Sequence, residues 1–183
     1  MRKLAVLGLA LALVFSLAAV AAAAPLFTIS TNLSDFASCT LQEFDDTTLN
    51  PGVSVVSTNG YIDTTLDSWV DFVNGYEPAT TTWSFATPIT GFGGSFDLNP
   101  EGIGSGIHIS ADGYDVGDIT ANGFWGFFST EPLSTVMFSN VPTGQEHFYM
   151  DDMRYCPVPV PPAVWLLGSG LLGLMGLRRK LKA

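Results

Sequence analysis

The pattern of apolar and polar residues divides the chain into an apolar start, a long mixed middle and an apolar end. In the middle, residues 25–156, apolar residues alternate with polar ones over short runs, and helical spacing never continues for more than about two turns. In TTWSFA, for example, Trp83 and Phe85 fall on one face while Thr82 and Ser84 fall on the other. Such alternation is typical of a strand in a sheet that is covered on one side, so the middle is predicted to be all-β.

Short runs of strand-forming residues alternate with turn residues throughout this middle. The candidate strands are PLFTIS, TLQEF, VSVVS, SWVDFV, TTWSFA, ITGFGGSFDL, GIHIS, YDVGDIT, GFWGFFS, STVMFS and EHFYMDDMRY. Asp112-Gly113 is typical of a hairpin turn, because glycine adopts positive φ easily. In NLSDFAS, Asn32 is a suitable cap for one short helical turn. About ten short strands favour an antiparallel β-sandwich of jelly-roll type, and a single closed barrel is the alternative.

Composition and charge narrow the class of protein. The 183 residues are enough for one domain of ordinary size, and charged residues make up only 13%, about half the usual ~25% share. All 17 acidic residues lie between Asp35 and Asp152, whereas Arg154 is the only basic residue outside the two ends. A middle this acidic argues against a nucleic-acid or anionic-lipid surface, because both need Lys and Arg to meet phosphates.

The N-terminus has the order of a secretory signal peptide. Arg2-Lys3 precede an apolar run from Leu4 to Val20, which small residues follow. Because proline disfavours cleavage directly before it, the cut is expected after Ala22 or Ala23 rather than before Pro25. We therefore assign residues 1–23 to the signal peptide and 24–156 to an exported ectodomain, with an uncleaved anchor as the alternative.

The C-terminus reads as a linker, a short membrane helix and a basic stop. Residues 157–162 (PVPVPP) form a stiff extended stretch, because proline fixes φ and removes backbone donors. Residues 163–177 contain no charge and would cover ~22 Å as a helix, somewhat less than the ~30 Å hydrocarbon core. Residues 178–183 follow, with Arg178, Arg179 and Lys180 at the start. Positive flanks stay cytoplasmic, so the acidic middle is expected outside.

This order resembles the PEP-CTERM sorting signal of exported proteins in Gram-negative bacteria. The resemblance covers residues 158–180, with Val158, Pro159, Val160 and Pro161 in the motif and Val160 where many members have Glu. It implies a temporary membrane anchor that an exosortase, a transpeptidase-like membrane protease, recognises. It also implies passage through the inner membrane to the cell surface or the extracellular matrix, in association with exopolysaccharide.

The only two cysteines, Cys39 and Cys156, are expected to form a disulfide, because export places them in an oxidising compartment. Two free thiols are the alternative. The bond would also bring together two acidic segments, EFDD after Cys39 and Asp151-Asp152 before Cys156. Crowded carboxylates are costly unless a cation neutralises them, and Ca²⁺ prefers oxygen ligands.

The segments EFDD and FYMDDMRY resemble the terminal strands of jelly-roll carbohydrate-binding modules, where acids at these places hold a structural Ca²⁺. By position, Glu43 or Asp45 would pair with Asp151 or Asp152 as metal ligands. Adjacent residues of a regular strand point to opposite faces, so only one of the two aspartates is expected to serve. Solvated acids, or an ion pair with Arg154, are the alternative interpretation.

The remaining candidates for metal binding, catalysis or sugar stacking have less support from the sequence. The acids of DGYDVGD lack the EF-hand pattern, and His108 and His147 stand in strands with no ligand at metal-binding spacing. No nucleophile elbow or other catalytic constellation is found, so no enzyme is predicted. Trp69, Tyr76 and Trp125 are candidates for stacking on sugar rings, although most large aromatics are core residues.

Three functions follow from these observations. The main hypothesis is a non-catalytic surface or matrix protein, sorted through its C-terminal helix and associated with exopolysaccharide. The alternative is a carbohydrate-binding module. The third, a hydrolase of surface glycans, requires two carboxylates ~5 to 9.5 Å apart in a cleft.

Overall fold

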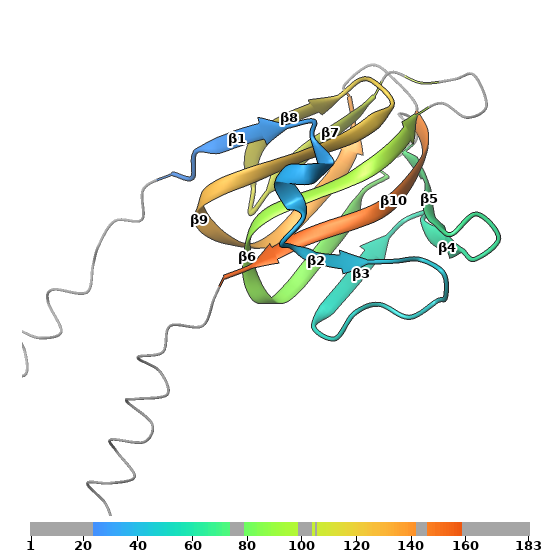
Figure 1. Cartoon of the computed structure of the whole chain (residues 1–183). Helices are drawn as coiled ribbons and strands as arrows, with labels where there is room; N and C mark the ends of the chain where they lie inside the picture. Colours follow the sequence, from blue (N-terminus) through green and yellow to red (C-terminus); the bar gives the residue numbers. More distant parts are fainter. Residues whose placement is uncertain (1–23, 74–78, 99–103, 105, 142–145, 159–183) are drawn as a thin grey trace, which may run out of the picture.

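The computed structural model describes residues 24–73, 79–98, 104, 106–141 and 146–158 (Figure 1). The predicted signal peptide, the membrane helix at 163–177 and the basic tail lie outside these residues. Within the described ranges, no helix is long and apolar enough to cross a membrane. What the structure describes therefore covers most of the predicted domain at 24–156 and the first two residues of the predicted linker, of which Pro157 belongs to a strand; the remainder of the linker and sorting motif also lies outside.

This part of the chain is all-β and antiparallel, as predicted, with one short 3₁₀ helix. Its elements are β1 Phe27–Ser30, η1 Leu33–Phe36, β2 Thr40–Gln42, β3 Val53–Ser57, β4 Tyr61–Asp63, β5 Ser68–Val73, β6 Thr81–Leu98, β7 Ile107–Ala111, β8 Tyr114–Ile119, β9 Gly123–Asn140 and β10 Glu146–Pro157. The strands follow the order β4-β5-β10-β6-β9-β7-β8, while β1 pairs with β9, β2 with β10 and β3 with β6.

The two long strands β6 and β9 belong to both layers of a β-sandwich. The first half of β6 pairs with β3 and with the second half of β9, whereas its second half pairs with β10 and with the first half of β9. Between the halves lie exposed Pro88 and Pro132, and the register shifts between Ser84 and Gly91. Proline cannot donate a ladder hydrogen bond, so both strands bend there. Figure 1 shows the two strands side by side across the molecule.

This bend corrects the strand assignment made from the sequence. TTWSFA and ITGFGGSFDL, expected as two strands, form the single β6, and GFWGFFS and STVMFS form the single β9. The short β4, Tyr61–Asp63, was not expected at all. The two-layered result agrees with the predicted sandwich and not with a closed barrel.

Aromatic rings fill the space between the layers. Phe138, on the second half of β9, lies 5.8 Å from Phe92, 6.0 Å from Phe96 and 5.9 Å from Phe148 between ring centroids. Those three side chains come from the opposite layer. All four are almost completely buried, and each such ring stabilises the fold by about 1.5–3 kcal/mol.

The glycine-rich runs of β6 and β9 permit close approach of the N-terminal segment. A Cβ at Gly126 would lie 2.7 Å from the ring of Phe36 and 2.8 Å from the carbonyl oxygen of Phe92. Phe36, on η1, is fully buried and stacks on Phe128 at 4.3 Å. The Asn32 side chain accepts a hydrogen bond from the Ser34 N–H, which confirms the predicted cap.

The Cys39–Cys156 disulfide is present and joins the residue before β2 to the end of β10. A Cβ at Gly91 would lie 2.8 Å from the sulfur of Cys156, so β6 packs directly against the bond. The bond closes a loop across 117 residues. In the chain-entropy model it therefore restricts the unfolded state strongly.

Replacing both cysteines with serine is expected to lower the free energy of unfolding by about 2–5 kcal/mol. Chemical denaturation of wild type and the double variant measures the change, and reduced wild type should match the variant. Mass spectrometry verifies that the thiols of the reduced wild type are free. If the denaturation midpoint of that sample is unchanged, the disulfide does not stabilise the fold.

Candidate functional site

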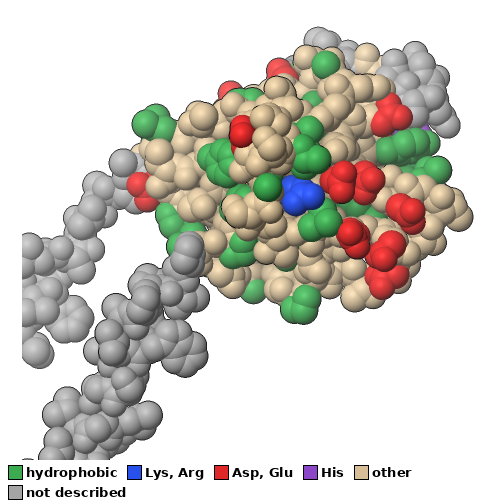
Figure 2. Space-filling model, in the orientation of Figure 1, with side chains coloured by type: hydrophobic (Ala, Val, Ile, Leu, Met, Phe, Trp, Pro, Cys, Tyr) green, Lys and Arg blue, Asp and Glu red, His purple; other side chains and the backbone are tan. Residues whose placement is uncertain are grey.

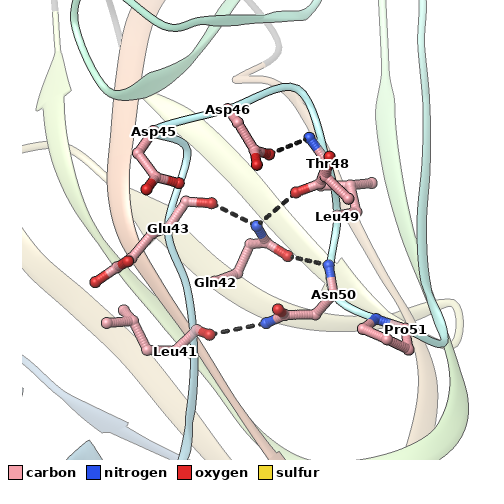
Figure 3. A pocket seen from close by; sticks show the side chains of 9 residues that line it. All are labelled: Leu41, Gln42, Glu43, Asp45, Asp46, Thr48, Leu49, Asn50 and Pro51. Atoms are coloured by element: carbon pink, nitrogen blue, oxygen red, sulfur yellow. Dashed lines mark hydrogen bonds between the residues drawn. The ribbon is translucent and has the colours of Figure 1, made fainter.

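The loop between β2 and β3 separates two hollows on one edge of the sandwich. The first has a volume of about 440 Å³ and is polar (Figure 3). Its lining residues are Leu41, Gln42, Glu43, Asp45, Asp46, Thr48, Leu49, Asn50 and Pro51. Leu49 also lines the second hollow, so the two adjoin.

The side chain of Gln42 holds this loop in place from its centre. Its amide nitrogen donates to the carbonyl oxygens of Glu43 and Thr48, and its amide oxygen accepts from the Asn50 N–H at 2.6 Å (Figure 3). The Asn50 side chain in turn donates to the Leu41 carbonyl at 2.8 Å. Gln42 is only 2% exposed, so its polar atoms require these partners.

The loop leaves the carboxylates of Glu43 and Asp45 free for other partners. Neither makes a hydrogen bond or ion pair with any residue the structure describes, whereas Asp46 accepts from the Thr48 N–H at 2.5 Å. In Figure 3 the carboxylate of Glu43 points away from Gln42. The loop therefore presents acceptors toward solvent.

Register brings further acids to the same edge. Gln42 lies opposite Met153, which places Glu43 next to Asp152, and Ser68 follows Asp67 beside the same part of β10. We call the resulting set the acidic rim: Glu43, Asp45, Asp46, Asp63, Asp67, Asp151 and Asp152. Figure 2 shows acidic side chains gathered on this face beside the single described basic side chain, that of Arg154.

A β-bulge changes how the two adjacent aspartates lie. Asp152 has φ 49°, and the register of β10 on β6 shifts between Asp151 and Arg154. The extra residue resets the alternation, so Met150 and Met153 are both buried while Asp151 and Asp152 are both half-buried. The premise of a regular strand therefore does not hold here, whereas the expectation that only one of the two aspartates serves as a metal ligand stays a prediction.

The pKa values of two rim carboxyls are shifted in opposite directions. Partial burial raises the pKa of Asp151, and the charges of Asp152 and Asp67 act in the same direction. The pKa of Asp63 is lowered, chiefly because the Thr65 hydroxyl donates to its carboxylate at 2.6 Å. The ionised form of Asp151 is thus disfavoured in the folded protein, whereas the ionised form of Asp63 is favoured.

The predicted calcium ligands share this edge but do not converge on one point. Among the described residues, no three Asp, Glu, His or Cys side chains are grouped closely enough to hold a metal ion. Arg154 makes no ion pair within the same part of the chain, and its Nε has no hydrogen-bond partner there. The structural Ca²⁺ therefore stays a prediction, with Asp67 as a neighbour of Asp151 that the sequence did not indicate.

The second hollow is a groove of about 620 Å³ between β3 and β4, which we call the β3–β4 groove. Its lining residues are Thr47, Leu49, Val55, Val56, Ser57, Gly60, Tyr61, Ile62 and Trp69. Tyr61 is 55% exposed, whereas Trp69 is 4% exposed. Tyr61 therefore provides an accessible ring at the groove, and Trp69 contributes only a small part of its surface.

Buried polar groups lie behind this groove. Asp71 is 2% exposed and accepts hydrogen bonds from the Ser57 and Thr81 hydroxyls and from the Trp69 indole N–H. Trp83 packs against Trp69 at 5.0 Å and is fully buried, yet its own indole N–H has no partner among the residues that the structure describes. The groove thus has a satisfied carboxylate and an unsatisfied donor close behind its wall.

The other predicted site residues lie elsewhere. Trp125 is 8% exposed and lines a separate hollow with Asn122 and Phe124, and Tyr76 lies outside the described residues. His108 is bonded to Asp118 at 2.7 Å, and Asp112 accepts from the Thr135 N–H at 2.8 Å. Neither Trp69 nor Trp125 offers an open ring face, because both help to fill the core.

Two groups were missed at the sequence level. Tyr61 stands in a run too short to read as a strand. Asp71 shares a strand face with Trp69, and an acid at such an inward position is the signal that would have marked it.

We expect Asp151→Asn to stabilise the protein at neutral pH by less than about 1 kcal/mol, because solvent screens partly exposed charges. The folded pKa of Asp151 is raised, so the cost of its charge is present above that pKa and disappears as the pH falls through it. The new amide oxygen can still accept from the Asp152 N–H. Free energies of unfolding measured against pH should show the two proteins converging in acid.

Asp63→Asn is the matched control, with the opposite sign. Its lowered pKa means that the carboxylate stabilises the fold at neutral pH, and this contribution is lost as the pH falls.

The predicted structural Ca²⁺ is tested by unfolding the wild type in Ca²⁺ and in chelator. Bound calcium would raise the unfolding midpoint, and an identical midpoint in the two solutions would discard the calcium site.

Comparison with known proteins gives two structural likenesses. No family model and no curated protein matches the chain. A mutant of a family 29 carbohydrate binding module matches with a TM-score of 0.45 and 7% identity, over 72% of this chain and 92% of that one. A family 29 carbohydrate binding module from Piromyces equi matches with a TM-score of 0.41 and 11% identity, over 74% and 93%. These low values assign the chain to no family.

Proposed function

We propose that the chain is an exported, non-catalytic β-sandwich that binds polysaccharide at the cell surface or in the extracellular matrix. The β3–β4 groove is the observation that carries the proposal. Its volume of about 620 Å³ lies within the ~300–1,000 Å³ range of ligand pockets. It lies open along the edge of the sandwich, which suits a polymer that passes through better than an enclosed small molecule.

The lining of the groove suits the mixed surface of a sugar ring. Tyr61 can stack on the apolar face of a pyranose, and Val55 and Ile62 extend the apolar surface. The Ser57 hydroxyl at the same wall already donates to Asp71 and accepts from Thr81 and the Gly60 N–H, so the hydroxyls of Thr47 and Tyr61 are the polar groups open to a ligand. A few placed polar groups on a mostly apolar wall are what fixes the orientation of a ligand.

The groove favours binding over cleavage of a glycan. None of its nine described lining residues is Asp, Glu or His, whereas glycoside hydrolysis uses a pair of carboxylates beside the scissile bond. Asp71 lies behind the wall and is already engaged by three donors. A sugar in the groove would therefore be held without a general acid beside it.

Export rests on the two ends of the chain and on the cysteines. The signal-like start and the sorting-like end bracket the domain, and an exosortase-type protease is the proposed partner at the membrane. The Cys39–Cys156 bond is of the kind that oxidising compartments maintain. These features support a surface or matrix location, and exopolysaccharide is the proposed ligand there.

Tyr61→Ala is expected to weaken binding to the native matrix polysaccharide roughly two- to tenfold, because ring stacking contributes about 0.5–1.5 kcal/mol. Affinity electrophoresis through gels that contain the polysaccharide measures the loss. Tyr114→Ala is the matched control, since Tyr114 is 45% exposed on β8, away from the groove. Equal retardation of wild type and both variants would count against the groove.

Mass spectrometry of the native extracellular protein is expected to show a mature form that lacks residues 1–23 and the C-terminal helix, with both cysteines oxidised. Fractionation should place this form with the outer surface or the matrix. Recovery of the intact, reduced chain from cytosol would refute the export half of the proposal.

A further inference from the structure

The charges around the β3–β4 groove are almost entirely of one sign. Leu49 lines both hollows, so the groove adjoins the hollow lined by Glu43, Asp45 and Asp46. At the other wall, β4 runs from Tyr61 in the groove to Asp63 at the rim. A polymer longer than the groove would therefore approach the carboxylates of the acidic rim.

These carboxylates have little internal compensation. Arg154 is the only Lys or Arg among the described residues, and it forms no ion pair with any of them. The carboxylates of Glu43, Asp45, Asp67 and Asp152 likewise make no hydrogen bond within that part of the chain. A carboxylate is an acceptor only, so these groups have open places for donors.

The resulting field selects among polysaccharides. Charges interact over a screening length of about 8 Å at physiological ionic strength, which is comparable to the size of one sugar unit. Uronate or sulfate groups beside the rim would be repelled, and neutral sugars would gain only hydroxyl hydrogen bonds. A sugar ammonium group would gain charge-assisted hydrogen bonds, which are about twice as strong as neutral ones.

We infer that the groove and the acidic rim together bind an amino-sugar polymer that carries free ammonium groups. This inference rests on the proposed function, because it assigns the ligand class of the same groove. The pyranose ring of one unit lies on Tyr61, and the ammonium group of a following unit meets Asp45 and Asp46. The charge of the rim and the apolar groove thus serve one cationic glycan chain.

The test compares three soluble probes of equal length by isothermal titration calorimetry, with chelator present to remove divalent cations. These are a glucosamine oligomer, its fully N-acetylated counterpart and a uronate oligomer, at a pH where the amines are protonated. The glucosamine oligomer is expected to bind at least about tenfold more tightly than the acetylated one at low salt. The difference should shrink as salt is added.

Two variants separate the parts of the site. The double variant Asp45→Asn and Asp46→Asn should lose the preference for glucosamine and keep the binding of the acetylated oligomer. The loop should keep its shape in this variant, since the amide oxygen that replaces the Asp46 carboxylate can still accept from the Thr48 N–H. Tyr61→Ala should weaken the binding of both oligomers. Circular dichroism and the unfolding midpoint verify that each variant is folded.

The outcomes distinguish this inference from the proposal beneath it. Equal affinity for the glucosamine and acetylated oligomers, with Tyr61→Ala weakening both, overturns the cationic ligand and leaves the groove in place. Binding of glucosamine that Tyr61→Ala does not alter shows adhesion to the acidic surface alone and overturns both. Tighter binding of the uronate oligomer also overturns the inference.

Discussion

The sharing of β6 and β9 between the two layers is the constraint on which the rest of the structure depends. Because each strand bends at an exposed proline, Pro88 or Pro132, one antiparallel sheet closes over its own aromatic core. Phe138 then meets rings from the opposite layer, and Trp83 meets Trp69. Within the described strands, the bend also leaves β3 and β4 in different layers with their outer edges unpaired. The groove lies between these two edges, and the loop between β2 and β3 completes its wall with Thr47 and Leu49.

The acidic rim follows from three local features that meet at the same edge. The Gln42 network fixes the loop after β2, the bulge at Asp151-Asp152 places two carboxylates on it, and the turn before β5 adds Asp67. The pKa of Asp151 is raised chiefly by its partial burial, and the neighbouring charges of Asp152 and Asp67 add to the effect. The rim therefore gathers its acids at an edge where at least Asp151 carries its charge less favourably than in water.

Much of the fold could be predicted from the sequence, because alternation and turn residues are local signals. The Asn32 cap, the Asp112-Gly113 hairpin and the disulfide are all confirmed. The bends were missed because proline and its exposed neighbours give the same signal in a bent strand as in a turn. The aromatic candidates were misjudged for a different reason: composition marks Trp69 and Trp125 as large rings, and only tertiary packing decides that they face inward. Tyr61 became visible as a site residue only through its exposure.

The outer edge of β3 is open to pairing with a second copy of the chain. Residues Val53–Ser57 carry no charge and no proline, and Val56 is 76% exposed, so this edge lacks the usual protection against pairing with another copy. The acidic rim begins in the loop just before it, and a second copy would bring its own rim with it. The like charges of two such rims would repel each other. The carboxylates that would attract a cationic glycan would therefore also oppose the pairing of two β3 edges.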